Sequence, residues 1–89
     1  NGDKYVGEFK DGKKNGQGLL KFKDGAVYEG GFKNDKSHGK GSLTFAEGDK
    51  YVGDFENGDF NGQGTMYDRD SNVIYSGKWI NGDPEGGMK

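Results

Sequence analysis

Apolar and polar residues alternate along most of this 89-residue chain. The alternation is clearest in residues 5–9 and in residues 16–22, where every second residue is aromatic, aliphatic or glycine. A period of two places successive side chains on opposite faces of a β-strand. The pattern therefore predicts short strands, each with one apolar and one polar face, and it predicts no helix.

The same pattern recurs at a nearly fixed interval. The clearest markers are Tyr5, Tyr28, Tyr51 and Tyr75, which are separated by 23, 23 and 24 residues. A glycine follows each tyrosine by two residues, and an aromatic residue follows by four: Phe9, Phe32, Phe55 and Trp79. With two strands in each unit, this repeat predicts an all-β, elongated open antiparallel meander of hairpins. The units are residues 5–27, 28–50 and 51–74, with an incomplete unit over 75–89.

Turn-forming residues separate the predicted strands. Within the units they fill residues 11–15, 34–38, 57–61 and 81–85, where Asn, Asp and Gly tolerate left-handed backbone angles. Between units, Asp24-Gly25 and Glu47-Gly48 are typical of tight hairpin turns. The third inter-unit segment, residues 68–73, has one extra residue and no glycine. We therefore expect a bulged or wider turn there.

The two faces of the predicted sheet differ. One face carries mostly charged side chains and suits water, whereas the other carries aromatic rings that alternate with glycines. We expect the rings of one unit to lie over the glycines of the next and to form a continuous ladder. Strands ~4.8 Å apart, two in each of about four units, predict a rod roughly 35–40 Å long.

The run from Tyr5 through Gly7, Phe9 and Gly12 to Gly16-Gln-Gly18, with its three further copies, resembles the MORN (membrane occupation and recognition nexus) repeat. The family pattern is Tyr-x-Gly-x-Trp/Phe-x-x-Gly-x-x-x-Gly-x-Gly, and the resemblance covers nearly the whole chain. It implies a curved or grooved antiparallel sheet. It also implies a non-catalytic role in protein binding, lipid contact or dimer formation.

Composition narrows the candidate functions. The chain has no cysteine, and only 28% of its residues are hydrophobic, so we expect a thin core without disulfides or thiolate metal sites. No run of residues approaches the ~18 consecutive apolar residues of a membrane span. A net charge of -2 and a pI of 5.3 argue against nucleic acid as a partner. We expect no cofactor, metal or small-molecule substrate.

The aromatic row is the first candidate binding surface. In a single sheet it would form both the core and the floor of a groove that accepts a partner's helix or extended segment. The predicted groove residues are Tyr5, Phe9, Tyr28, Phe32, Tyr51, Phe55, Tyr75 and Trp79. Exposed strand edges offer an alternative, homodimerisation, which would double the mass measured by light scattering. Because residues 1–5 parallel residues 47–51, we also expect the chain to be a segment of a longer protein.

Charge is distributed unevenly and gives a second candidate surface. Residues 1–45 hold nine Lys and six Asp or Glu, a net +3, whereas residues 46–89 hold four Lys or Arg and nine Asp or Glu, a net -5. The lysines that could face an anionic lipid surface or an acidic partner are Lys10, Lys13, Lys14, Lys33 and Lys36. Asp11 and Asp35 interrupt this group, so a solvated surface is the competing interpretation.

Three shorter motifs favour structural interpretations. Residues 68–72 imitate the opening of a calcium loop but lack its glycine and its glutamate, which predicts a polar turn. Residues 39–42, Gly-Lys-Gly-Ser, lack the frame and the helix of a phosphate loop. His38 with Ser37 and Asp35 could be written as a catalytic trio, but we expect all three on one solvated turn, without the concave site that catalysis needs.

Overall fold

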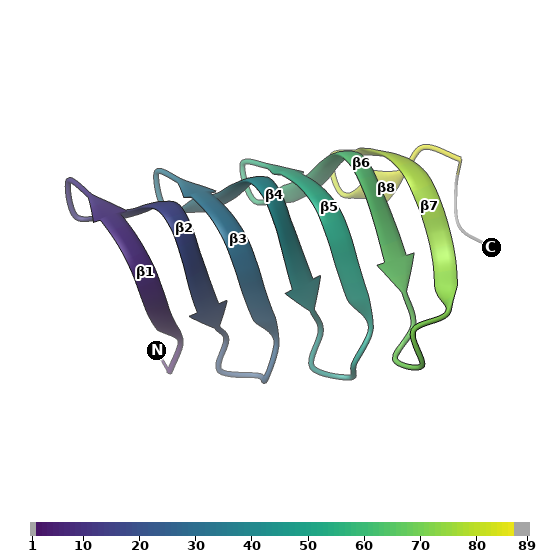
Figure 1. Ribbon diagram of the computed structural model, residues 1–89, viewed down its shortest axis with the longest axis horizontal. Helices are drawn as coiled ribbons and strands as arrows, with labels where there is room; N and C mark the ends of the chain where they lie inside the picture. Colours follow the sequence, from purple (N-terminus) through teal and green to yellow (C-terminus); the bar gives the residue numbers. More distant parts are fainter. Residues whose placement is uncertain (1, 87–89) are drawn as a thin grey trace.

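The computed structural model describes residues 2–86, which form one open antiparallel sheet (Figure 1). The strands are β1 (Lys4–Lys10), β2 (Lys13–Lys21), β3 (Val27–Lys33), β4 (Lys36–Thr44), β5 (Lys50–Glu56), β6 (Asp59–Tyr67), β7 (Val73–Ile80) and β8 (Asp83–Pro84). Their order in the sheet is their order in the chain. The predicted meander of successive hairpins without a helix is confirmed.

The molecule is elongated along the direction in which the strands succeed one another. Its principal extents are 41 × 23 × 17 Å, and β1 and β7 lie toward opposite ends of the longest axis (Figure 1). This agrees with the predicted rod. Since each strand pairs with its sequence neighbours, every unit contacts the units beside it, as in other repeat proteins.

The turns within the units are shorter than the sequence predicts. Lys10 pairs with Lys13, so Asp11 and Gly12 alone make the first turn, with φ of 53° and 79°. Positive φ at both positions is what a two-residue hairpin turn of type I′ requires. The second turn uses Asn34 at 50° and Asp35 at 73°. The remaining Asn, Asp and Gly residues of the predicted turns belong to the strands that follow.

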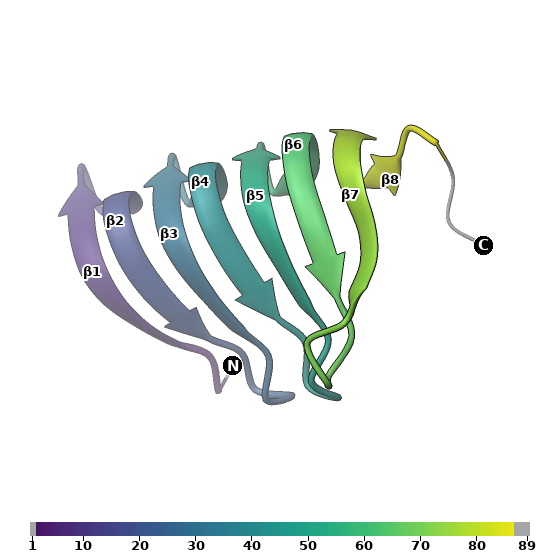
Figure 2. The same cartoon turned by 45° about the vertical axis from the view of Figure 1, so that its right-hand side comes forward.

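A bulge in which one residue faces three explains why turn-like residues continue into β2, β4 and β6. Between Gly7↔Gly18 and Phe9↔Lys14, the single residue Glu8 of β1 faces three residues of β2, with Gly16 at the centre at φ 96°. The same shift recurs between β3 and β4 and between β5 and β6. Bulges bend strands. In Figure 2 the starts of β2, β4 and β6 curl over at the upper end of the sheet.

The extra residue of the third inter-unit segment lies in a strand and not in the turn. Asp68 N–H donates to Asn72 O and Ser71 N–H to Asp68 O, which is the same bonding that Phe22, Gly25 and Ala26 make in the first inter-unit turn. Ser71 takes the glycine's place at φ 68°. Tyr67 then pairs with Val73 but Met66 with Tyr75, which leaves Ile74 as a bulge in β7. The predicted bulged or wider turn is therefore wrong, because this turn keeps the usual bonding and the bulge lies in β7.

Candidate binding surfaces

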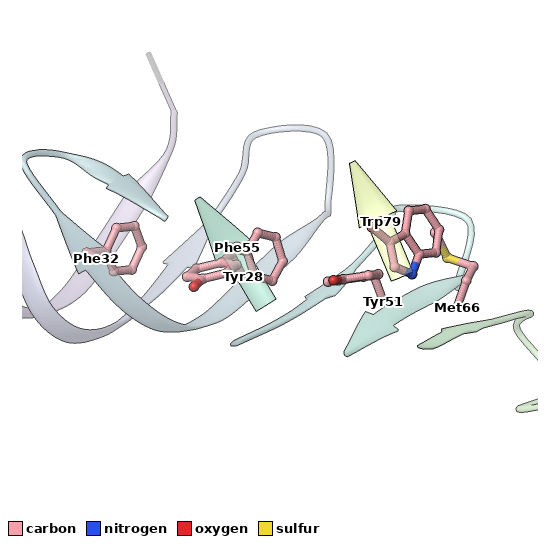
Figure 3. Packing of buried hydrophobic residues seen from close by; sticks show 6 residues of the cluster. All are labelled: Tyr28, Phe32, Tyr51, Phe55, Met66 and Trp79. Carbon is pink, nitrogen blue, oxygen red and sulfur yellow. The ribbon is translucent and has the colours of Figure 1, made fainter. Parts of the chain in front are cut away.

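The aromatic residues of the four units form one continuous ladder. Its members lie in the spatial order Phe9, Tyr5, Phe32, Tyr28, Phe55, Tyr51, Trp79 and Tyr75. Each neighbouring pair meets edge to face, with ring centroids 4.9–5.4 Å apart, the favoured arrangement of aromatic pairs. Tyrosines alternate with the Phe or Trp of the same and the next unit. Figure 3 shows the middle of this ladder.

The tyrosine rings lie over glycines of their own unit, and the prediction from the sequence that they lie over glycines of the next unit is wrong. A Cβ placed on Gly18 would collide with the ring of Tyr5, and one on Gly64 would collide with Tyr51. The reason is a local hydrogen bond in which each tyrosine hydroxyl donates to the carbonyl three residues later, at 2.7–3.1 Å. Burial raises the pKa of Tyr28 and that of Tyr51 to about 12, so both hydroxyls stay protonated donors near neutral pH.

Most of the predicted groove residues are buried. Tyr28, Phe32, Tyr51, Phe55 and Trp79 are between 0% and 6% exposed. These five rings therefore offer little surface to a partner, and Tyr28, Phe32 and Phe55 are accessible only where they line the hollow described below. Tyr5 and Tyr75 are half-buried, and Phe9 on β1 is 61% exposed.

The accessible part of the inner face, the face that carries the ladder, consists of half-buried apolar side chains that pack against the buried rings. They are Tyr5, Leu20, Phe22, Leu43, Phe45, Phe60 and Tyr75. Leu20 and Leu43 alternate with tyrosines in one row across the sheet, since Leu20 pairs with Tyr28 and Leu43 with Tyr51. Pairing thus places apolar surface on the same face in consecutive units.

An apolar hollow of this face lies in the second unit. It has a volume of about 370 Å³ and is bounded by Leu20, Phe22, Leu43 and the buried rings of Tyr28, Phe32 and Phe55. Its rim is polar and comes from two successive turns and from β4, with Asp35, Lys36, Ser37, Asn57 and Gly58. An apolar floor with a polar rim is the usual make-up of a binding pocket.

Three of the five predicted lysines gather around a second hollow. Lys10, Lys13 and Lys33 line a space of about 600 Å³ beside the turns of the first and second units, together with Asp11 and His38. The two-residue turns bring these lysines together although they are up to 23 residues apart in the sequence.

Lys14 and Lys36 lie elsewhere. Lys14 lies on the inner face, with Nζ 5.6 Å from the centroid of the Tyr5 ring and 3.9 Å from the carboxylate of Asp35. Lys36 lies at the rim of the apolar hollow. The structure therefore separates the predicted lysine group into a basic hollow and two single lysines on or beside the inner face.

Comparison with known families agrees with this geometry. The family model of the MORN repeat matches residues 5–27, 28–50, 51–73 and 75–86. The chain belongs to the MORN repeat family. Such repeats are known as protein- and membrane-associated modules and are generally non-catalytic. No curated protein matches the chain.

His38 lies within β4 and not in a turn, which corrects the sequence prediction. At the corresponding positions, Asn15 Oδ1 accepts the N–H of Asn34 at 3.3 Å and Asn61 Oδ1 accepts that of Asn81 at 3.0 Å. His38 replaces these asparagines within β4, and its Nδ1 is buried without a hydrogen-bond partner. His38 therefore occupies a structural position of the repeat, the one that Asn15 and Asn61 occupy in the first and third units.

The other motifs also have structural roles in the MORN array. Asp68 Oδ1 accepts the N–H groups of Asp70 and Asn72, each at 2.9 Å, and these bonds, the one from Asn72 foremost, lower the pKa of Asp68. Lys40 pairs with Asp54 across β4 and β5. Residues 2–86 hold no group of three or more His, Cys, Asp or Glu placed to bind a metal ion. No helix in this part has the length and apolar character of a membrane span.

The residues that form the accessible apolar surface were not among the site residues predicted from the sequence. Leu20, Phe22 and Leu43 were overlooked as site residues because the tyrosines and their partner aromatics dominate the repeat pattern. The signal that could have found them is their own recurrence, since Leu20 and Leu43, and likewise Phe22 and Phe45, stand one period of 23 residues apart.

Proposed function

We propose that this MORN array is a non-catalytic binding module that holds a segment of a partner protein on its inner face. The observation that carries the proposal is the run of half-buried apolar side chains along that face, three of which line a hollow of about 370 Å³. Apolar surface of this kind is a common feature of interaction sites. The buried ladder beneath it keeps the face rigid, so little ordering is needed on binding.

The test is selection of peptides from a random displayed library on the immobilised chain. Selected peptides should lose binding to the variant Phe22→Ser, which removes apolar surface from the inner face. They should keep binding to the control Val52→Ser, because Val52 is 40% exposed on the opposite face. Failure to select any peptide, or equal sensitivity to both substitutions, would contradict the proposal.

A second candidate function is contact with anionic lipid head groups, and the basic hollow favours it. Lys10, Lys13 and Lys33 line one space of about 600 Å³, and each lysine near an anionic surface contributes about 1 kcal/mol. Asp11 in the same lining weakens this attraction. The protein-binding proposal therefore comes first.

Co-sedimentation with vesicles separates the two candidates. We expect salt-sensitive binding to phosphatidylcholine vesicles that contain phosphatidylserine if the basic hollow contacts lipid, since surface charge is screened by salt. The variant Lys10→Gln/Lys33→Gln should lose that binding. A control of equal net charge, Lys4→Gln/Lys21→Gln, changes two lysines that pair at the other end of the first hairpin. No pelleting of the wild type at low salt would eliminate this candidate.

A further inference from the structure

One position of the repeat differs in chemistry in every unit. It lies in the second strand of each hairpin, directly opposite the Phe or Trp of the first strand. The pairs are Lys14 opposite Phe9, Ser37 opposite Phe32, Phe60 opposite Phe55 and Pro84 opposite Trp79. Serine is the smallest side chain in this series.

The third unit shows what a ring does at this position. Phe60 stacks on Tyr51, with ring centroids 4.0 Å apart and ring planes at 16° to each other. Its other aromatic neighbours are Phe45, Phe55 and Trp79, with centroids at 6.3, 5.4 and 5.3 Å. Phe60 thus lies among four aromatic rings of the inner face.

The second unit has the same aromatic surroundings without the ring. The residues that correspond to the four neighbours of Phe60 are Phe22, Tyr28, Phe32 and Phe55. All four line the apolar hollow of about 370 Å³, as does Ser37 itself. The hollow is therefore the place that an aromatic side chain fills one unit later.

The charges at the rim of this hollow favour acidic residues next to the side chain that fills the hollow. Asp35, the one acidic residue of the lining, is already engaged, because it accepts the N–H of Lys14 at 2.7 Å and lies 3.9 Å from Lys14 Nζ. Lys36 is exposed at the rim and pairs across the turn with exposed Lys33. Residues 1–45 carry a net charge of +3. Complementary charge would steer and orient an acidic segment here.

We propose that this hollow, the Ser37 socket, takes one aromatic side chain of a partner segment in which acidic residues flank that side chain. The ring would lie against Tyr28 as Phe60 lies against Tyr51, and the acidic residues would face Lys33 and Lys36. The inference rests on the proposed function, since it names the chemistry of the segment that the inner face holds.

The test is an NMR titration of the isotope-labelled chain with a blocked acidic pentapeptide that has one central phenylalanine. Amide shifts of Ser37, Leu43 and Asn57 should change and saturate. Replacing the central phenylalanine by alanine should weaken binding about tenfold or more, as expected for losing the burial of one aromatic side chain. Replacing the acidic residues by lysines should also weaken it, and added salt should reduce the difference.

Two variants of one residue provide the decisive control. Ser37→Phe fills the socket with the ring found in the third unit and should weaken binding about tenfold or more, whereas Ser37→Ala leaves the socket open and should bind like the wild type. The amide spectrum of each variant reports whether it is folded. An aliphatic peptide that binds as well as the aromatic one would overturn the choice of ring, and equal binding to Ser37→Phe would overturn the socket.

Two experimental outcomes distinguish a failure of the Ser37 socket from a failure of the proposed function. Peptides selected on the inner face that depend on Phe22 but still bind Ser37→Phe would support the module and overturn the socket. A selection that yields no peptide dependent on Phe22 would overturn both.

Discussion

The first and the third MORN units have the same register but very different surroundings. Tyr5 and Phe9 lie on β1, which has a neighbouring strand on one side within the described chain, and Phe9 is 61% exposed. Tyr51 and Phe55 lie on β5 between two strands, at 0% and 4% exposed. Residues at equivalent positions of the repeat therefore contribute differently to stability, because the contribution of each depends on the strands that lie beside it.

The largest expected difference between these units comes from deleting the ring that follows the tyrosine. Phe55→Ala removes a side chain that contacts Tyr28, Tyr51 and Phe60, and it should lower the free energy of unfolding by about 3–5 kcal/mol. Phe9→Ala should lower it by about 0.5 kcal/mol or less, as exposed substitutions do. Urea denaturation followed by circular dichroism measures both.

Because a loss of this size can unfold a small domain, Phe55→Leu and Phe9→Leu provide a milder pair. Phe55→Leu should again lower the free energy of unfolding more than Phe9→Leu does. Equal losses at the two positions would mean that the ladder does not concentrate stability in the middle units.

A smaller difference should come from filling the space under the tyrosine. Gly18 and Gly64 each lie beneath the ring of the tyrosine of their unit, and a Cβ at either would collide with it. Tyr51 is enclosed by Phe55, Phe60 and Trp79, so it has no room to move. Gly64→Ala should therefore cost about 2–3 kcal/mol, the upper range for overpacking.

Gly18→Ala is the matched variant in the first unit. Half-buried Tyr5 can shift toward solvent, so the loss should be near 1 kcal/mol, the lower end of the range for overpacking. Melting temperatures of the two variants test this order. A larger loss for Gly18→Ala than for Gly64→Ala would contradict the packing argument.

The fold was predictable from sequence because tyrosine, glycine and a second aromatic recur at one interval, and pairing in a meander follows chain order. The ladder followed from the same residues. The position of the rings over the glycines could not be predicted in this way. It depends on the hydrogen bond from the Tyr5 hydroxyl to the carbonyl of Glu8, which joins residues three apart and does not affect the repeat period.

The turns and the binding surface were harder to predict for a physical reason. Asn15 and Gly16 have turn-like chemistry, yet they lie in a bulged strand, and a bulge uses the same positive φ that a turn uses. The apolar hollow depends on Ser37 having rings from β3, from β5 and from the turn after β2 around it, an arrangement that no single segment of the sequence encodes. Sequence located the apolar face but not its accessible part.

The smallest expected difference concerns one carboxylate at equivalent positions of the two units. Asp54 and Glu8 each accept the backbone N–H of a glutamine, Gln63 and Gln17, at 3.0 and 3.2 Å. Asp54 additionally pairs with Lys40 of the preceding unit, and this bond is the main cause that lowers the pKa of Asp54. Among the described residues, no unit precedes the first to offer Glu8 such a lysine.

A lowered pKa in the folded protein favours the ionised carboxylate there. The pair with Lys40 therefore stabilises the fold fully at pH values above the ordinary aspartate pKa of 3.8, and this contribution is lost as the pH falls through the lower folded value. Because the pair is partly exposed, the contribution should be below about 1 kcal/mol. We expect Lys40→Gln to lower the urea midpoint at neutral pH and to reduce its decline in acid, whereas Lys4→Gln on β1 should change neither. If the urea midpoints of Lys40→Gln and of the wild type declined in parallel as the pH falls, the ion pair between Lys40 and Asp54 would not contribute to the stability of the second and third units.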